Sequence, residues 1–336
     1  MFLLPNMLIY MYLWLTAHFL LIYKLIMFQQ TPKDIISFSG IGLHTGCHAN
    51  VRILPAKEDT GIVFKRTDIP DSPNIKASNS NVVATAYATT LGVKGASVST
   101  VEHLLAAFYG LGIDNAIIEL DGPEVPILDG SAAEFIGMLQ AAGIRTLPKK
   151  RKYLVVKRPI KVYEEDKYVL LLPSDDTGLT IDYSIDFSHR YLDKQTFSGL
   201  FSKEVFRDEV GSARTFGFLR DVEMLRRNGF AKGGSLKNVV VIGDDKKILN
   251  EEGLRYPDEF VRHKVLDMMG DISLVGAPII GRLIAHRSGH SLNFRLVQQI
   301  LARPHRWQFT ENPAKESAAE EDIGWSYAGG AIALQA

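Results

Sequence analysis

A stretch in the carboxyl-terminal half of the sequence places metal-binding side chains on one face of a predicted helix. In FVRHKVLDMMGDISLVG, residues 260–276, His263, Asp267 and Asp271 follow one another at intervals of four. Helical residues four apart project from the same face, so an imidazole nitrogen and a carboxylate oxygen can meet one divalent metal, with Asp271 orienting a ligand from behind. The alternative is an ordinary helix surface with one i,i+4 pair, worth about 0.2–0.5 kcal/mol.

A second chemically capable pair, Glu102 and His103, lies near the start of a predicted helix in VEHL. Adjacent helical residues point about 100° apart, so His103 can ligate a metal while Glu102 acts as a general base on the attacking water. Together with His263 and Asp267, His103 gives two nitrogens and one oxygen. That set leaves one position of a zinc ion open, which is typical of catalytic rather than structural sites. Such a site would join the two halves of the chain.

Two further motifs offer a proton donor and an oxyanion donor. RSGHSLN, residues 287–293, places His290 on a glycine-flanked turn at a helix start, where an imidazole can approach a pocket and protonate a leaving amine. In ARTFGF, residues 213–218, Thr215 can donate a hydrogen bond to a developing oxyanion, whereas the two phenylalanines are typical of a core.

The glycine-rich stretch SGIGLHTG, residues 39–46, lacks the lysine and the spacing of a phosphate-binding P-loop. It favours a tight turn between strands over a direct functional role for His44.

Composition narrows the class of protein. The 336 residues are enough for two domains of about 100–200 residues each. Basic and acidic side chains number 38 each, so the net charge indicates no general nucleic-acid binder and a charged ligand must be bound locally. Cys47 is the only cysteine, which excludes an intrachain disulfide and a multi-cysteine zinc site and suits the reducing cytoplasm.

Residues 1–26 form a hydrophobic extension with two competing interpretations. Residues 1–23 carry no charged side chain, and Met7 to Tyr23 match a short membrane span or signal anchor. The biased composition of the extension, which stops at Met27, favours a misassigned start instead. We therefore expect a cytoplasmic protein, with membrane association through residues 1–23 as the alternative.

The succession of elements predicts an α+β fold. Short apolar runs broken by glycine and proline indicate strands, and both halves of the sequence run strands, helix, strand, helix. In the first half, Ser99 or Thr100 is the expected cap of the helix that carries VEHL.

Together with the extension over residues 1–26, this pattern divides the chain into four segments. Residues 27–148 form the first α+β domain and residues 149–305 the second, with a basic, poorly structured joint at residues 146–152. Residues 306–336 are polar and rich in small residues, which is typical of a flexible tail.

Six motifs, spread from about residue 33 to residue 303, together match the pattern of one protein family. In order along the chain they are SGIGLHTG, TVEHL, PILDGSAAEF, ARTFGF, GLRYPDEFVRHKVLDMMGD and SGHSLN. The sequence resembles the zinc-dependent UDP-3-O-acyl-N-acetylglucosamine deacetylases, which commit a sugar nucleotide to lipid A synthesis for the Gram-negative outer membrane. The resemblance implies hydrolysis of the N-acetyl group with release of acetate. It also implies two similar domains, each with helices packed on a sheet, and an active site between them.

The resemblance assigns roles to individual positions. His103, His263 and Asp267 become the Zn²⁺ ligands and Glu102 the general base. The other catalytic positions that it implies are His290 as proton donor, Thr215 as oxyanion donor and Asp271 as support of His290 or of the ligand shell.

The substrate positions also follow from the resemblance. Helix 218–225 and the GGS turn at residues 233–235 would line a passage for the acyl chain, and Phe187 would stack on uracil. The substrate-binding set that the resemblance implies is Lys264, Phe187, Asp186, Lys167, Arg287, Phe216 and Phe218, with Lys167 and Arg287 at the pyrophosphate.

Two other functions compete with this one. A catalytically silent nucleotide-sugar-binding or scaffold protein has no use for a base and an acid together. A different metal amidohydrolase would have to account for the acyl passage and the basic uridine site.

Overall fold

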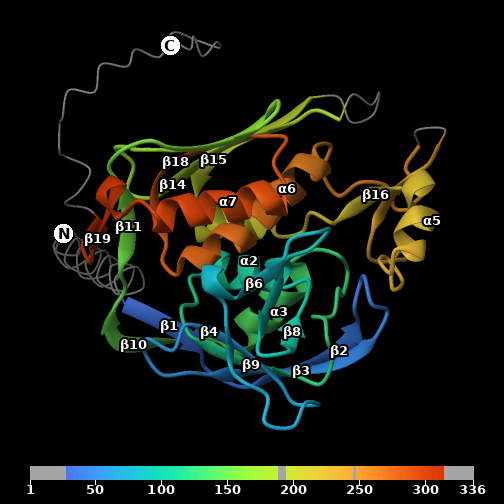
Figure 1. The fold of residues 1–336 in the computed structure, drawn as a ribbon, viewed down its shortest axis with the longest axis horizontal. Coiled ribbons are helices and arrows are strands. Elements are labelled where there is room, and N and C mark those ends of the chain that lie inside the picture. Colours follow the sequence, from blue (N-terminus) through green and yellow to red (C-terminus); the bar gives the residue numbers. More distant parts are fainter. Residues whose placement is uncertain (1–27, 188–193, 245–246, 314–336) are drawn as a thin grey trace, which may run out of the picture.

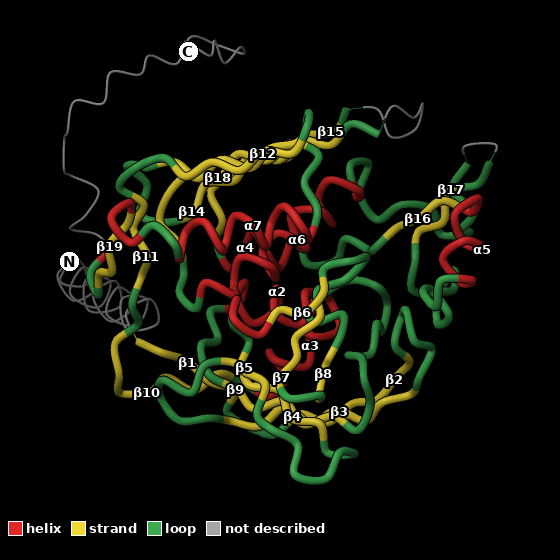
Figure 2. The backbone as a smooth tube through the Cα atoms, viewed as in Figure 1, coloured by secondary structure: helices red, strands yellow, loops and turns green. Residues whose placement is uncertain are grey.

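The structure is a computed structural model that describes residues 28–187, 194–244 and 247–313. Its main helices lie between two sheets, one formed by the earlier and one by the later part of the chain (Figure 1). Figure 2 shows the same succession of strands, helices and strands. The predicted α+β class is therefore confirmed, and the predicted division into domains at residues 148 and 149 stays a prediction.

The first sheet has five strands. In spatial order they are β2 (Ile36–Ile41), β3 (His48–Pro55), β9 (Ala116–Leu120), β4 (Ile62–Arg66) and β5 (Ile75–Lys76). Ala49, Val51 and Ile53 of β3 are buried while the residues between them are exposed, so one face of the sheet packs on the helices. Each large apolar side chain buried in this way contributes about 1.5–3 kcal/mol.

Two smaller sheets complete the first part of the chain. Their strands are β6 (Val82–Ala84), β7 (Thr90–Val93) and β8 (Ala96–Val98) in one, and β1 (Phe28–Pro32) with β10 (Ile144–Lys150) in the other. The prediction of a poorly structured joint over residues 146–152 is wrong, because β10 forms an antiparallel ladder with β1. A strand partner far away in the sequence supplied the hydrogen bonds that the local composition did not indicate.

The second sheet is centred on a strand that pairs with three others. Its strands are β12 (Ile160–Glu164), β13 (Lys167–Leu172), β18 (Ile279–His286), β11 (Tyr153–Val156), β19 (Trp307–Thr310), β14 (Leu179–Ile185) and β15 (Gln195–Phe201). β18 lies parallel to β11 and β14 and antiparallel to β13. The prediction of a tail from residue 306 is wrong for β19, which pairs with β11; residues 314–336 lie outside the described residues.

Four helices fill the space between the two sheets. They are α2 (Glu102–Leu111), α3 (Ala133–Ala142), α6 (Glu259–Ile272) and α7 (His290–Leu301). α2 and α6 cross closely at Gly270, where an added Cβ would lie 2.1 Å from the backbone oxygen of Glu102. Glycine is therefore required at this position, and the crossing brings residues 102–103 next to the buried face of α6.

A smaller unit projects beside the helices, at the right of Figure 1. β16 (Phe216–Phe218) pairs in parallel with β17 (Val240–Ile242), and α5 (Leu219–Arg227) connects them. The predicted helix over residues 218–225 is thus displaced by one residue at its start, because Phe218 belongs to the strand. The remaining short helices are η1 (Asn79–Asn81), α4 (Lys203–Val205), η2 (Phe206–Val210), η3 (Ser273–Val275) and η4 (Pro304–Arg306).

The hydrophobic extension predicted over residues 1–26 lies outside the described residues. Among the helices of the described residues, none has the length and apolar character needed to cross a membrane.

Candidate active site

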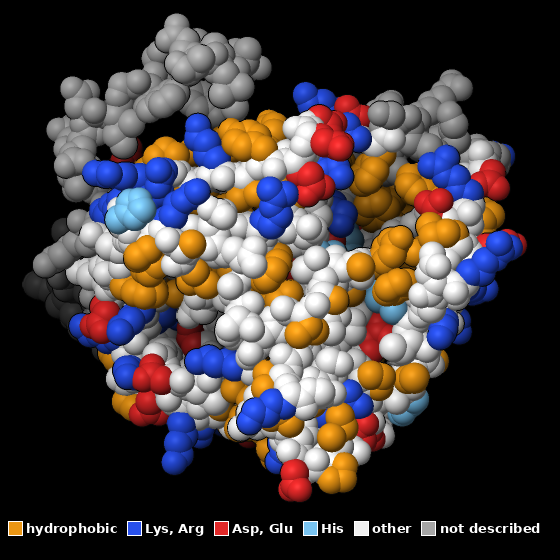
Figure 3. All heavy atoms as spheres, in the orientation of Figure 1, with side chains coloured by type: hydrophobic (Ala, Val, Ile, Leu, Met, Phe, Trp, Pro, Cys, Tyr) orange, Lys and Arg blue, Asp and Glu red, His pale blue; other side chains and the backbone are white. Residues whose placement is uncertain are grey.

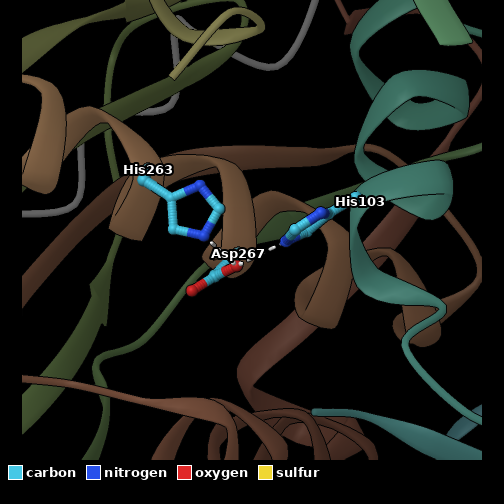
Figure 4. Close-up of side chains that lie close together, drawn as sticks. All are labelled: His103, His263 and Asp267. Carbon is cyan, nitrogen blue, oxygen red and sulfur yellow. Dashed lines mark ion pairs between the residues drawn. The ribbon is translucent and has the colours of Figure 1, made fainter. Parts of the chain in front are cut away.

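Three predicted metal ligands converge where α2 meets α6 (Figure 4). His103 comes from α2, whereas His263 and Asp267 lie one turn apart on α6. Nε2 of His103 lies 3.5 Å from Oδ1 of Asp267, and Nε2 of His263 lies 3.3 Å from the same oxygen. All three side chains are buried, and their ligand atoms lie within 4.8 Å of one another, so this metal cluster could hold one ion.

The chemistry of the cluster fits a divalent metal. Nδ1 of His263 lies 3.0 Å from the carbonyl oxygen of Ala213, so that nitrogen carries the proton and Nε2 presents its lone pair to the cluster. Burial lowers the pKa of His263 to about 3, which keeps the imidazole neutral. A neutral imidazole is the form that binds metals.

Lys264 faces the cluster from the side. Its Nζ donates a hydrogen bond to Oδ2 of Asp267 over 2.7 Å, leaving Oδ1 for the two imidazoles. Although burial favours the neutral acid, the ammonium group of Lys264 lowers the pKa of Asp267 well below its usual value. The carboxylate is therefore ionised and can act as a ligand.

Glu102 lies beside the cluster at the first residue of α2. Its Oε2 accepts a hydrogen bond from the backbone N–H of Thr89 over 3.0 Å, while Oε1 lies 4.0 Å from Nε2 of His290. Burial raises the pKa of the Glu102 carboxyl, although the charge of His290 opposes the shift. A carboxyl with a raised pKa is suited to accept a proton near neutral pH.

His290, the first residue of α7, is held from behind by a carboxylate. Its Nδ1 lies 2.8 Å from Oδ2 of Asp271, which also accepts a hydrogen bond from Nδ2 of Asn293 over 2.8 Å. Burial disfavours the charged imidazole, but Asp271 outweighs it and, with other nearby carboxylates, raises the pKa of His290 to about 9. His290 is thus protonated at neutral pH, and of the two roles left open for Asp271 the geometry favours support of His290.

We call Glu102, His103, His263, Asp267 and His290 the reaction centre. They line an inner cavity of about 200 Å³ together with Thr215, Phe216 and Lys264. The predicted proton donor, base and metal ligands are therefore brought together by elements far apart in the sequence. Thr215 is fixed by its backbone, since its N–H donates to the carbonyl of Gly130 over 2.8 Å and its own carbonyl accepts from Val240 N–H over 2.8 Å.

A larger groove of about 490 Å³ opens beside the reaction centre and shares His290 and Lys264 with it. Figure 3 shows a hollow on the side of the molecule toward α5, bordered by hydrophobic side chains. We refer to this cavity as the groove. The predicted substrate residues that line it are Lys167, Asp186, Phe187, Lys264 and Arg287.

The groove residues are more exposed than the reaction centre and lie against acidic or aromatic neighbours. Nζ of Lys167 lies 3.8 Å from Glu164, and Arg287 donates a hydrogen bond to Asp166. The ring of Phe187 is 38% exposed, and its edge contacts the ring of Phe216 at a centroid distance of 5.8 Å.

Two residues considered in the sequence analysis lie outside both cavities. Phe218 lines neither cavity; it lies in β16, with the guanidinium of Arg220 4.8 Å from its ring centroid. His44 lies in a turn between β2 and β3, as predicted, with its ring 5.4 Å from that of Phe230.

Sequence reasoning missed Glu124, a fully buried carboxylate that fixes the turn at residues 42–45 to the start of α2. It accepts hydrogen bonds from the backbone N–H of His44 over 2.9 Å and of Thr45 over 2.7 Å, and from the hydroxyl of Thr100 over 2.6 Å. The prediction that Ser99 or Thr100 caps α2 is wrong: the N-cap position is Val101, with no side-chain cap, and the hydroxyl of Thr100 is bound to Glu124. A single glutamate between glycine and prolines gave no local signal for this role.

Sequence reasoning also missed the buried ion pair of Arg214 and Glu259, which lies behind the metal cluster. Nε and the backbone N–H of Arg214 both donate to Oε1 of Glu259, over 2.9 and 3.0 Å. Arg214 follows Ala213, whose carbonyl accepts from His263, and Glu259 begins the helix that carries His263. The pair therefore ties the loop at residues 211–215 to the start of α6.

Comparisons with known proteins point in one direction. The family model described as UDP-3-O-acyl N-acetylglycosamine deacetylase matches residues 29–302. A protein of Syntrophus aciditrophicus named UDP-3-O-acyl-N-acetylglucosamine deacetylase is 49% identical over 83% of this chain and 88% of its own length. Proteins of the same name from Citrifermentans bemidjiense and Myxococcus xanthus are 49% and 45% identical, cover 88% and 91% of this chain, and are each matched over 96% of their own length.

Proposed function

The chain belongs to the family of UDP-3-O-acyl-N-acetylglucosamine deacetylases, and from this membership we propose that it is a zinc-dependent amide hydrolase. Its substrate is UDP-3-O-acyl-N-acetylglucosamine, from which it removes the N-acetyl group and releases acetate. This reaction is the committed step of lipid A biosynthesis. The single observation that carries the proposal is the convergence of a metal cluster, a buried carboxylate and a protonated imidazole on one cavity.

His103, His263 and Asp267 would hold the metal. Zinc, when bound there, supplies Lewis acidity to the acetyl carbonyl and to the attacking water. The two imidazoles and one carboxylate leave a coordination position open, as catalytic zinc sites do.

Glu102 and His290 divide the proton transfers. Glu102 takes a proton from the water while the water oxygen bonds to the acetyl carbon. The raised pKa of Glu102 suits that task. His290 gives its Nε2 proton to the amide nitrogen as the C–N bond breaks, so the products are acetate and a free amine. The hydroxyl of Thr215 donates a hydrogen bond to the oxyanion formed in between.

The groove would bind the nucleotide. Phe187 offers an exposed ring for the uracil, with Asp186 beside it, and Lys167 and Arg287 offer positive charge to the diphosphate. Lys264 would contact the sugar beside the cluster, and Phe216 lies at the inner end near the acyl chain.

The test is deacetylation of the acylated UDP-sugar by protein loaded with zinc and by protein stripped of metal. We expect release of acetate only from the loaded protein, and near-complete loss with Glu102→Ala or His263→Ala in folded protein. Turnover like that of the parent enzyme by either variant would refute the proposed site. Tight binding of the UDP-sugar without any acetate release would favour the silent binding protein.

A further inference from the structure

Thr89 is a buried residue just before β7 that contacts Glu102 of the reaction centre and Asp271, the partner of His290. Its side chain is 2% exposed, and three of its polar atoms are bonded. The backbone N–H donates to Oε2 of Glu102 over 3.0 Å, the carbonyl accepts from Val101 N–H over 3.3 Å, and the hydroxyl donates to Oδ1 of Asp271 over 2.6 Å.

The second oxygen of Asp271 completes the connection. Oδ2 lies 2.8 Å from Nδ1 of His290 and accepts from Nδ2 of Asn293 over 2.8 Å. Both oxygens of this buried carboxylate are therefore bonded, and only Thr89 bonds Oδ1 among the described residues. If this carboxylate rotated, it would lose at least one of these hydrogen bonds. Such bonds are strong because the acceptor is charged.

We propose that Thr89 is a positioning residue that fixes the general base and the proton donor relative to each other. Its backbone holds Glu102, and its hydroxyl sets Asp271, which in turn holds His290. The inference rests on the proposed function, because it takes Glu102 as base and His290 as acid. It assigns to one residue the alignment of a group on α2 with a group on α7, the second through Asp271 of α6.

Alignment matters here because both groups act on one amide. Oε1 of Glu102 and Nε2 of His290 lie 4.0 Å apart, so a small rotation of Asp271 would move the proton donor off the leaving nitrogen. Substrate binding in the groove does not involve Thr89, which lines neither cavity. Loss of the Thr89 hydroxyl should therefore lower kcat and leave KM unchanged.

Thr89→Val removes the hydroxyl, keeps the shape and keeps the backbone N–H on Glu102. We expect kcat to fall about 10–100-fold with KM within about 2-fold, the size usual for a residue that orients an active group. Thr90→Val is the matched control: its hydroxyl lies 2.9 Å from the hydroxyl of Ser99, outside the site, and parent-like kinetics are expected. Thr89→Ser restores the donor and should return kcat to within about 3-fold of the parent.

A double variant tests the route through Asp271. If Thr89 acts through that carboxylate, Thr89→Val combined with Asp271→Asn should be no slower than Asp271→Asn alone. A kcat within about 2-fold of the parent in Thr89→Val, or additive losses in the double variant, would overturn the inference. Should the valine variant not fold, Thr89→Ala compared with Thr89→Ser isolates the hydroxyl in the same way.

A measurement without substrate separates this inference from the proposed function. In the zinc-loaded protein labelled with ¹⁵N-histidine, Thr89→Val should shift the ring signals of His290, and Thr90→Val should leave them in place. Unchanged His290 signals in Thr89→Val would refute the positioning role even if the parent enzyme is active. Failure of the parent to release acetate would refute the proposed function while these signals still decide the role of Thr89.

Discussion

The reaction centre and the groove beside it differ in how their charged groups are held. In the reaction centre, Glu102, His263 and Asp267 are 3%, 2% and 3% exposed, and each has a fixed partner. In the groove, the cations of Lys167 and Arg287 lie against Glu164 and Asp166 near the surface. The side chains of the centre are therefore held in place by the protein alone. Under the proposed function, the cations of the groove would exchange protein carboxylates for the phosphates of the substrate.

This difference implies different energetic consequences for mutation. Removing one partner in a buried centre leaves another group unsatisfied in a medium that screens charge weakly. Removing a cation at the rim changes an interaction that water and salt already weaken. Changes in the centre should thus reduce kcat strongly, and changes in the groove should raise KM modestly.

The largest effect is expected from His263→Ala. It removes a proposed metal ligand whose orientation is fixed by Ala213, so we expect loss of bound zinc and a fall in kcat/KM of at least about 10³-fold. Metal analysis and acetate release measure the two effects. The matched control is His286→Ala, because His286 lies in β18 with its Nδ1 2.8 Å from the Ser184 hydroxyl, outside both cavities. Retention of stoichiometric zinc by His263→Ala would contradict the assignment.

Glu102→Gln should come next, with kcat lower by about 10²–10⁴-fold and zinc retained. The amide keeps an oxygen that can accept the hydrogen bond of Thr89 N–H but no longer accepts a proton. Steady-state kinetics with metal analysis test this prediction. Equal losses of zinc and of activity would instead make Glu102 part of the metal site.

The pH dependence should be bell-shaped. The proposed mechanism needs Glu102 ionised and His290 protonated, so activity should fall as pH drops through the raised pKa of Glu102 and as pH rises through about 9. Asp271→Asn removes the carboxylate that outweighs burial at His290, so the alkaline limb should move to lower pH. An alkaline limb that stays in place in this variant would mean that another group titrates there.

The same shift predicts a dependence of stability on pH in the metal-free protein. Because the pKa of His290 is raised above its usual value of about 6.5, its contribution to the free energy of unfolding is full below about pH 6.5 and is lost as pH rises through about 9. Denaturant titrations of parent and His290→Gln at pH 6 and pH 10 should therefore differ most at the lower pH.

The smallest effect is expected in the groove. Arg287→Ala should raise KM about 3–10-fold with kcat within about 2-fold, and the increase should shrink at high salt. Arg52→Ala is the charge-matched control, since Arg52 pairs with Glu119 on the first sheet and neither residue lines the groove. A fall in kcat as large as that of Glu102→Gln would remove the distinction between centre and groove.

Local patterns predicted the groups on single helices better than the contacts between elements. The spacing of His263, Asp267 and Asp271 was enough to place them on one face of α6, because helical geometry is local. The roles of Thr89 and Glu124 were not predictable, since their partners lie on segments far away in the sequence. β10 and β19 were missed for the same reason: basic and polar residues form strands there because β1 and β11 provide the ladders.

The close crossing of α2 and α6 has a consequence for the order of events during synthesis. His103 leaves the ribosome about 160 residues before His263, which corresponds to roughly 10–30 s at about 5–20 residues per second. During that interval one imidazole is too few to retain a metal, and the face of α2 that α6 will cover has no partner. The metal that we propose for this cluster could therefore be retained only after α6 has been made and has packed against α2.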